Sequence, residues 1–102
     1  ATEAGAVSCD LGAKWTARTL SSSEKFDANA GCNGVWAIES YVYNDQVRGR
    51  FYKDGAWQTS SYSWQWVYWN GASQPKIVGN TTTGRDIKGQ AANYDQYVIY
   101  EF

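Results

Sequence analysis

The chain contains no histidine, and this absence removes several classes of enzyme. Without histidine, neither a Ser-His-acid triad nor a Cys-His pair can form, and the zinc-protease motif that holds its metal with two histidines is excluded. The sequence also lacks a glycine-rich phosphate-binding loop. What remains is glycosidase chemistry, which needs two carboxylates at a defined separation.

The candidate carboxylates for such chemistry have better structural explanations. The least unfavourable pairing joins Glu39 to Asp45 or Asp54. Both aspartates lie in expected turns, where aspartate is favoured because its side chain hydrogen-bonds to nearby backbone. Glu39 is expected to have an arginine opposite it on a neighbouring strand. We therefore expect a protein that is not an enzyme and has no catalytic residues.

The chain also lacks an excess of basic residues and any long apolar run. Its formal net charge is −1, whereas nucleic-acid-binding domains usually carry a basic face. No stretch approaches the roughly 18 to 20 consecutive apolar residues of a membrane span. We expect neither nucleic-acid binding nor membrane insertion. The N-terminus shows no charged start followed by an apolar block, so we expect that any secretion signal has been removed.

Cysteine is scarce as well, with a single pair at Cys9 and Cys32. An isolated pair in a small, loop-rich chain is typical of a disulfide formed in an oxidising compartment, so we expect a secreted, extracellular protein. Two buried thiols are the alternative. A metal site is not expected, because two cysteines without histidine cannot complete a tetrahedral shell. We expect no cofactor.

Residues that favour strands are abundant, whereas helix signals are almost absent. Val, Ile, Thr, Tyr and Trp dominate, and turn clusters such as Asp54-Gly55 and Asn70-Gly71 recur roughly every eight to twelve residues. This pattern predicts one domain over residues 1–102, a single antiparallel β-sandwich or flattened barrel of about seven strands with one disulfide. One helical turn is expected over residues 21–27, where a serine could cap ahead of Glu24.

Two expected two-residue turns predict the register of a three-stranded meander. Asp54-Gly55 is a strong type I′ signal and pairs Tyr52 with Trp57. Asn44-Asp45 is a weaker signal, and it places Glu39 directly opposite Arg50 on the neighbouring strand. A one-residue slip in either hairpin would turn arginines toward the core, so the two turns support one another.

Alternation along these strands sorts the side chains onto two faces. The side expected to form core consists of Ile38, Val42, Val47 and Phe51. The side expected to face solvent carries Glu39, Tyr41, Tyr43, Arg48, Arg50, Tyr52, Trp57 and Thr59. In the last strand, from Tyr94 to Phe102, alternation turns Asp95 and Glu101 to solvent and buries Val98, Tyr100 and Phe102.

Aromatic residues are concentrated in one stretch, with six rings between Trp57 and Trp69. Leucine occurs only at positions 11 and 20, so many of the rings must fill the core. The part from Tyr62 to Trp69 has no obvious solvated side. We expect Trp66 in the core and Trp69, beside a turn, partly exposed.

Flat rings beside arginines on a rigid sheet suit the apolar faces of sugars, while Arg and Glu side chains can hydrogen-bond hydroxyl groups. The sequence therefore predicts a small lectin or polysaccharide-binding module. The expected ligand-binding residues are Glu39, Tyr41, Tyr43, Arg48, Arg50, Tyr52, Trp57 and Trp69.

Two alternatives stay open. Trp, Tyr and Arg also dominate the energetics of protein interfaces, so the same face would suit a secreted inhibitor or toxin-complex subunit that docks onto a partner protein. In the other alternative, a second sheet or the loop over residues 70–84 covers these rings, and they belong to the core.

Overall fold

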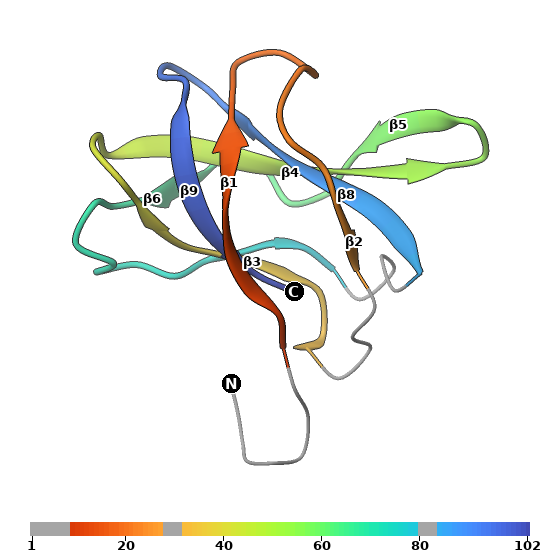
Figure 1. Cartoon of the computed structure of the whole chain (residues 1–102), viewed down its shortest axis with the longest axis horizontal. Helices are drawn as coiled ribbons and strands as arrows, with labels where there is room; N and C mark the ends of the chain where they lie inside the picture. The colour runs from red at the N-terminus through yellow and green to blue at the C-terminus, as the bar shows by residue number, and fades with distance from the viewer. Residues whose placement is uncertain (1–8, 28–31, 80–83) are drawn as a thin grey trace.

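The computed structural model describes residues 9–27, 32–79 and 84–102, and over these ranges the chain forms strands and no helix (Figure 1). The nine strands of this described part are β1 (Leu11–Thr16), β2 (Lys25–Asp27), β3 (Val35–Ser40), β4 (Asp45–Lys53), β5 (Ala56–Thr59), β6 (Gln65–Val67), β7 (Lys76–Val78), β8 (Arg85–Ala91) and β9 (Gln96–Glu101). The all-β prediction is confirmed. Three-residue strands such as β6 and β7 raise the number above the expected seven.

The strands form two antiparallel sheets that pack against each other as a sandwich (Figure 1). One sheet has the order β1-β9-β3-β7. The other sheet has the order β2-β8-β4-β5, and its fifth strand, β6, pairs with the first three residues of β4. A parallel bridge between Ala17 and Gln90 links the end of β1 to β8, so the two sheets are joined along this side.

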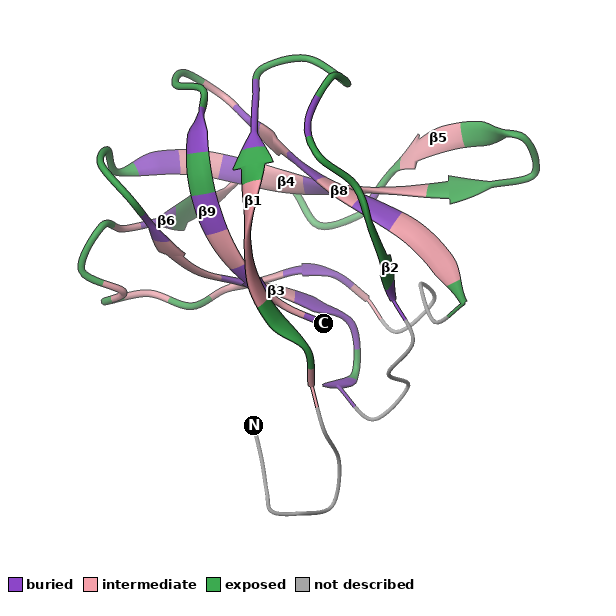
Figure 2. Cartoon of the chain, viewed as in Figure 1, coloured by how far each residue is buried: buried purple, intermediate pink, exposed green. Residues whose placement is uncertain are grey.

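The core lies between the sheets, and buried residues alternate with more exposed ones along β4, β8 and β9 (Figure 2). Its buried members are mainly aliphatic: Val35, Ala37, Val47, Val67, Ile77, Val78, Ile87 and Val98, together with Tyr100 and Phe102. The expectation for the last strand is confirmed, because Val98, Tyr100 and Phe102 are buried while Asp95 is exposed.

Two glycines on facing positions of β4 and β8 set the distance between the sheets. Gly49 and Gly89 are direct cross-strand partners, and both turn inward. A Cβ atom at Gly89 would overlap the Tyr100 hydroxyl, and one at Gly49 would overlap the Val78 side chain. Tyr100 therefore reaches across the core, where its hydroxyl shares a 2.5 Å hydrogen bond with Thr16 Oγ1.

The hairpin expected at Asp54-Gly55 is confirmed. Both turn residues have positive φ, 54° and 79°, as a type I′ turn requires. The register pairs Tyr52 with Trp57 and places Thr59 opposite Arg50. The hairpin of β4 and β5 extends beyond the body of the sandwich in Figure 1.

The hairpin expected at Asn44-Asp45 is wrong, and with it the three-stranded meander. β3 and β4 belong to different sheets, so residues 41–44 carry the chain from one layer to the other. Glu39 pairs with Ile99 instead of Arg50, and Arg50 pairs with Lys88. Val42, expected in the core, is 59% exposed in this crossing. Val47 is buried, and Phe51 packs partly buried against the core.

Two local expectations are also wrong. Residues 21–27 do not form a helical turn, because Lys25–Asp27 pairs with β8 as strand β2. Ser22 does not cap a helix, because its hydroxyl accepts a hydrogen bond from the backbone N–H of Ala17 and donates one to the carbonyl of Thr19. Trp66, expected in the core, is 46% exposed, because it lies opposite the outward-facing Gln46 on β4. Trp69 is exposed, as expected.

The disulfide is confirmed between Cys9 and Cys32, whose Cα atoms are 5.4 Å apart. It ties the residues before β1 to those before β3, so it connects the two flanks of β9 in the four-stranded sheet. Cys32 is buried, and its carbonyl accepts a hydrogen bond from the indole of Trp36.

Candidate functional site

Half of the predicted ligand-binding residues come together on the outer side of the five-stranded sheet. Arg48, Arg50 and Tyr52 alternate along β4 with inward-facing neighbours, and Trp57 lies opposite Tyr52 on β5. The Tyr52 and Trp57 rings meet edge to face, with centroids 5.4 Å apart and planes at 72°. Aromatic pairs prefer this arrangement, so the two rings hold each other in place on the sheet surface.

A single amide from β8 fixes both arginines. The Gln90 side-chain oxygen accepts hydrogen bonds from Arg48 Nε, at 3.0 Å, and from Arg50 Nη1, at 3.1 Å. The Gln90 amide nitrogen donates to the Arg18 carbonyl at 2.8 Å, so Gln90 is itself held in one orientation. Arg50 Nε also donates to the Gln58 carbonyl on β5. The two guanidinium groups are therefore preorganised side by side.

Two cations of this side lie over tryptophan rings. The Arg48 guanidinium carbon is 4.6 Å from the centroid of the Trp64 ring. The Lys88 ammonium is 4.6 Å from the centroid of the Trp57 ring and also donates to the Leu20 carbonyl. Cation–π contacts of this length hold a long side chain near a ring without neutralising its charge. We call the surface made by Arg48, Arg50, Tyr52, Trp57, Trp64, Trp66, Lys88 and Gln90 the cationic face.

Within residues 9–27, 32–79 and 84–102, no acidic residue forms an ion pair with a cation of the cationic face. Arg50 and Lys88 are direct cross-strand neighbours, and Arg48 is two residues along β4. Among the described residues, none of the three forms an ion pair. Burial, and secondly the repulsion from Arg48, lower the pKa of the Arg50 guanidinium. Alternation places one acid on this side of β8, Asp86, which is two residues from Lys88 and pairs with Phe26 of β2.

Exposed rings lie at both ends of the cationic face. Tyr52 is 42% exposed at one end, and Trp66, opposite Gln46, is at the other. The six-residue step from Gln46 to Tyr52 spans about 20 Å of extended strand. The face is thus an elongated strip with rings at its ends and cations between them, which suits a chain better than a single small molecule.

The other predicted ligand-binding residues lie elsewhere. Glu39 is on β3 in the four-stranded sheet, and Tyr41 follows that strand and contacts Tyr97. Tyr43 stacks on Tyr94, with ring centroids 4.3 Å apart, where the loops meet at one end of the sandwich. In the same region, the backbone N–H of Trp69 donates a hydrogen bond to the side-chain oxygen of Asn44. The sequence grouped Glu39, Tyr41 and Tyr43 with the arginines only because it paired β3 with β4, whereas Trp69 was predicted because it lies beside an expected turn.

A second aromatic surface covers the outside of the four-stranded sheet. Trp15 and Tyr97 are cross-strand partners there, with centroids 5.3 Å apart and planes at 71°. Leu11, Ala13 and Ile99 lie on the same side of these strands, and Leu11 is 66% exposed. We call these five residues the β1–β9 face. Among the described residues, no cation lies over either of its two rings.

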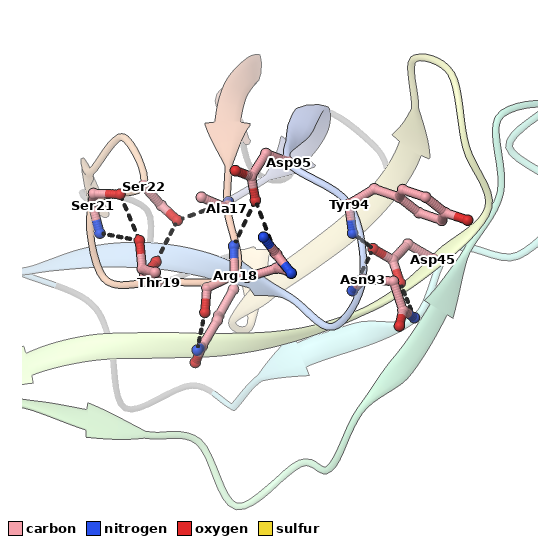
Figure 3. A network of polar contacts seen from close by, with 10 residues as sticks. Ala17, Arg18, Thr19, Ser21, Ser22, Asp45, Asn93, Tyr94 and Asp95 are labelled. Atoms are coloured by element: carbon pink, nitrogen blue, oxygen red, sulfur yellow. Dashed lines mark hydrogen bonds and ion pairs between the residues drawn. The ribbon is translucent and has the colours of Figure 1, made fainter.

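Asp45, considered above as a carboxylate for catalysis, is fully buried and hydrogen-bonded (Figure 3). Its two oxygens accept from the backbone N–H groups of Gln46, Asn93 and Tyr94 and from the Asn93 side chain, at 2.7–3.0 Å. Such an aspartate closes the turn between β8 and β9. Figure 3 also shows Arg18 beside Asp95, a solvent-exposed ion pair of 3.8 Å.

Sequence reasoning missed four residues of the cationic face: Trp64, Trp66, Lys88 and Gln90. A signal for two of them was present, because Lys88 and Gln90 alternate with the small or apolar residues Ile87, Gly89 and Ala91. This pattern predicts a strand with one polar side. It does not say that the strand pairs with β4, some forty residues earlier in the chain.

Over the described ranges, no group of three or more His, Cys, Asp or Glu residues could hold a metal ion. The same residues contain no helix that is long and apolar enough to cross a membrane. Comparison of the chain with protein-family models, with curated proteins and with solved structures gives no match.

Proposed function

We propose that the chain is a secreted, non-catalytic carbohydrate-binding protein whose ligand lies along the cationic face. One observation carries this proposal: Arg48 and Arg50 are fixed by a shared amide beside a cross-strand ring pair on the exposed side of a rigid sheet. Rings supply flat apolar surface for sugar rings, and oriented N–H donors bind sugar oxygens. Little ordering remains to be done on binding, which favours affinity.

Two further features support the proposal. The Cys9–Cys32 disulfide fits secretion, because such bonds persist in oxidising compartments. The three acids considered for glycosidase chemistry lie apart from one another: Glu39 is in the other sheet, Asp45 is buried in a turn, and Asp54 is in the hairpin turn. They supply no carboxylate pair beside the bound chain.

Tryptophan fluorescence measured against a panel of neutral and acidic polysaccharides tests this function. We expect a saturable change on titration, because Trp57 and Trp64 lie on the face. Trp57→Ala should weaken binding about tenfold, the loss of one well-packed anchoring ring. Its unfolding midpoint in urea should change little, because Trp57 is only partly buried on the sheet surface.

Trp15→Ala is the matched control, because Trp15 forms the same edge-to-face pair with a tyrosine on the β1–β9 face. It should keep the affinity of the unaltered protein. A fluorescence response that survives Trp57→Ala and disappears in Trp15→Ala would contradict the assignment of the site. The absence of any response across the panel would contradict carbohydrate binding itself.

A second candidate function is docking onto a partner protein, as an inhibitor or toxin-complex subunit does. The β1–β9 face favours it, because Leu11, Trp15 and Tyr97 expose apolar surface of the kind found at protein interfaces. A protein silent to every polysaccharide, with a partner whose binding is lost on Trp15→Ala, would support this candidate.

A further inference from the structure

The arrangement of charge on the cationic face is unusual for a chain with a formal net charge of −1. Arg50 and Lys88 are cross-strand partners, and like charges directly opposite one another destabilise a sheet. Arg48 adds a third positive charge on the same side of β4. The repulsion between the arginines contributes to lowering the pKa of Arg50. A negatively charged ligand would remove this unfavourable interaction.

The cations are held so that donors remain available to such a ligand. Arginine has five N–H donors in a planar fork. Within the described residues, Arg48 uses its Nε in a hydrogen bond, and Arg50 uses Nε and Nη1. The remaining Nη donors of two neighbouring guanidiniums are suited to carboxylate or sulfate oxygens, which arginine binds through paired hydrogen bonds.

The rings distinguish a sugar polymer from an anion alone. A small inorganic anion would use the arginines and leave Tyr52 and Trp66 exposed at the two ends of the strip. An extended chain of sugars would contact these rings and carry its charges over the cations between them. Aromatic side chains with exposed apolar surface and a polar rim favour this mixed contact.

We infer that the ligand of the cationic face is a polysaccharide whose sugars carry carboxylate or sulfate groups, an inference that rests on the proposed carbohydrate-binding function. Arg48 and Arg50 bind the acidic groups, Lys88 adds to the positive potential, and Tyr52, Trp57 and Trp66 contact the sugar rings. The net charge of the chain argued against nucleic-acid binding, but the sheet pairing gathers three of the nine cations of the chain on one surface.

The test compares polymers that differ only in charge or only in sugar. Polygalacturonate and its fully methyl-esterified form share one backbone, and only the first is ionised. Chondroitin sulfate and its desulfated form provide the sulfate comparison. Polyglutamate carries carboxylates without sugar rings. Affinity for each is measured by isothermal titration calorimetry at low and high sodium chloride.

At least one acidic polysaccharide should bind about tenfold or more tightly than its uncharged or less charged counterpart. Its affinity should fall by about tenfold on going from low to high salt, because screening weakens contacts between exposed charges. Arg48→Gln and Arg50→Gln should each weaken it about tenfold, the loss of a charged hydrogen bond. Lys76→Gln is the matched control, because Lys76 lies over Trp36 on the four-stranded sheet and should leave affinity unchanged.

Each other outcome has a distinct meaning. Equal binding of a polymer and its uncharged form would overturn the acidic preference and leave carbohydrate binding intact. Equal binding of polyglutamate and the acidic polysaccharides would overturn the need for sugar rings. Binding of neutral polysaccharides alone would overturn the inference, and binding of no polysaccharide would overturn the proposed function as well.

Discussion

The sandwich carries two tryptophan–tyrosine pairs on its opposite outer faces, in nearly the same geometry. Trp57 and Tyr52 lie 5.4 Å apart at 72°, and Trp15 and Tyr97 lie 5.3 Å apart at 71°. Both pairs are cross-strand neighbours in antiparallel sheets. The rings alone therefore do not distinguish a binding site from a surface that stiffens a sheet.

The neighbours of the two pairs differ. Beside Trp57 lie Arg50 and Lys88, and a network centred on Gln90 fixes the arginines. Beside Trp15 lie Leu11, Ala13 and Ile99, none of which offers a side-chain hydrogen bond. The cationic face can thus donate hydrogen bonds in a defined orientation, whereas the β1–β9 face presents apolar side chains beside two carboxylates, since Glu101 is opposite Leu11 and Glu39 is opposite Ile99. This difference is the reason for assigning glycan recognition to the five-stranded sheet.

The largest effect is expected from removing both arginines. Arg48→Gln combined with Arg50→Gln should weaken binding of an acidic polysaccharide by more than either single change and by up to about a hundredfold, because each arginine contributes a charged hydrogen bond but the two share Gln90 and are not independent. The equivalent double change on the other face, Trp15→Ala with Tyr97→Ala, should alter affinity less than about twofold. Calorimetric titration of both double variants measures the two affinities. Comparable losses of affinity in the two variants would contradict the assignment of the ligand to the cationic face.

A smaller effect on affinity is expected from changing Gln90, because this neutral side chain orients the two arginines but carries no charge of its own. Gln90→Ala should weaken binding about fivefold, because Arg48 and Arg50 then lose their shared acceptor and must be ordered on binding. Gln90→Glu restores an acceptor but adds a negative charge, so it should not restore affinity. Rescue of binding by glutamate would show that an added negative charge beside the arginines does not weaken binding, which would contradict recognition of an acidic ligand.

The smallest effect concerns Tyr100 of β9, whose ring packs against Gly89 of the other sheet and whose hydroxyl shares a hydrogen bond with Thr16 of the neighbouring strand β1. Burial raises the pKa of the Tyr100 hydroxyl, while the hydrogen bond with Thr16 opposes this shift in part. The pKa of Tyr100 in the folded protein exceeds the value of about 10 that tyrosine has in the unfolded chain. The protonated hydroxyl therefore contributes fully to the free energy of unfolding below pH 10, and this contribution is lost as the pH rises above about 10. At a pH of about 10.5 the free energy of unfolding should fall by about 1 kcal/mol because of this group.

Urea unfolding near pH 8 and near pH 10.5 measures this loss. Tyr100→Phe should show a smaller loss between the two pH values, although it is less stable than the unaltered protein at pH 8 because the Thr16 hydrogen bond is gone. Tyr94→Phe, at an exposed tyrosine, is the control and should keep the full pH dependence. Equal pH dependence in all three proteins would show that the buried Tyr100 hydroxyl is not the cause of the loss.

The parts of the fold that the sequence predicted are those set by local signals. Asp54-Gly55 requires positive φ at two successive residues, so it fixed the register of Tyr52 and Trp57 without knowledge of the rest of the chain. Alternation along Tyr94 to Phe102 likewise identified the buried residues of β9. In both cases the information lies within a few residues.

The parts that the sequence did not predict depend on distant partners. Asp45 is favoured in turns, but here it accepts hydrogen bonds from residues 93 and 94, and β4 begins at Asp45 itself. β4 consequently pairs with β8 instead of β3, which brings Lys88 and Gln90 beside the arginines and removes Glu39 from them. The ring pair and arginines were predictable, whereas the residues that make the face cationic and rigid were not.

The most direct test of the cationic face is a two-dimensional ¹H–¹⁵N NMR titration with a short oligomer of an acidic polysaccharide, following backbone and indole N–H signals. Shifts should concentrate on β4, β5 and β8 and on the indoles of Trp57, Trp64 and Trp66. The β1 and β9 signals and the Trp15 indole should stay in place. Shifts centred on Trp15, or none on β4 at saturating oligomer, would contradict the account.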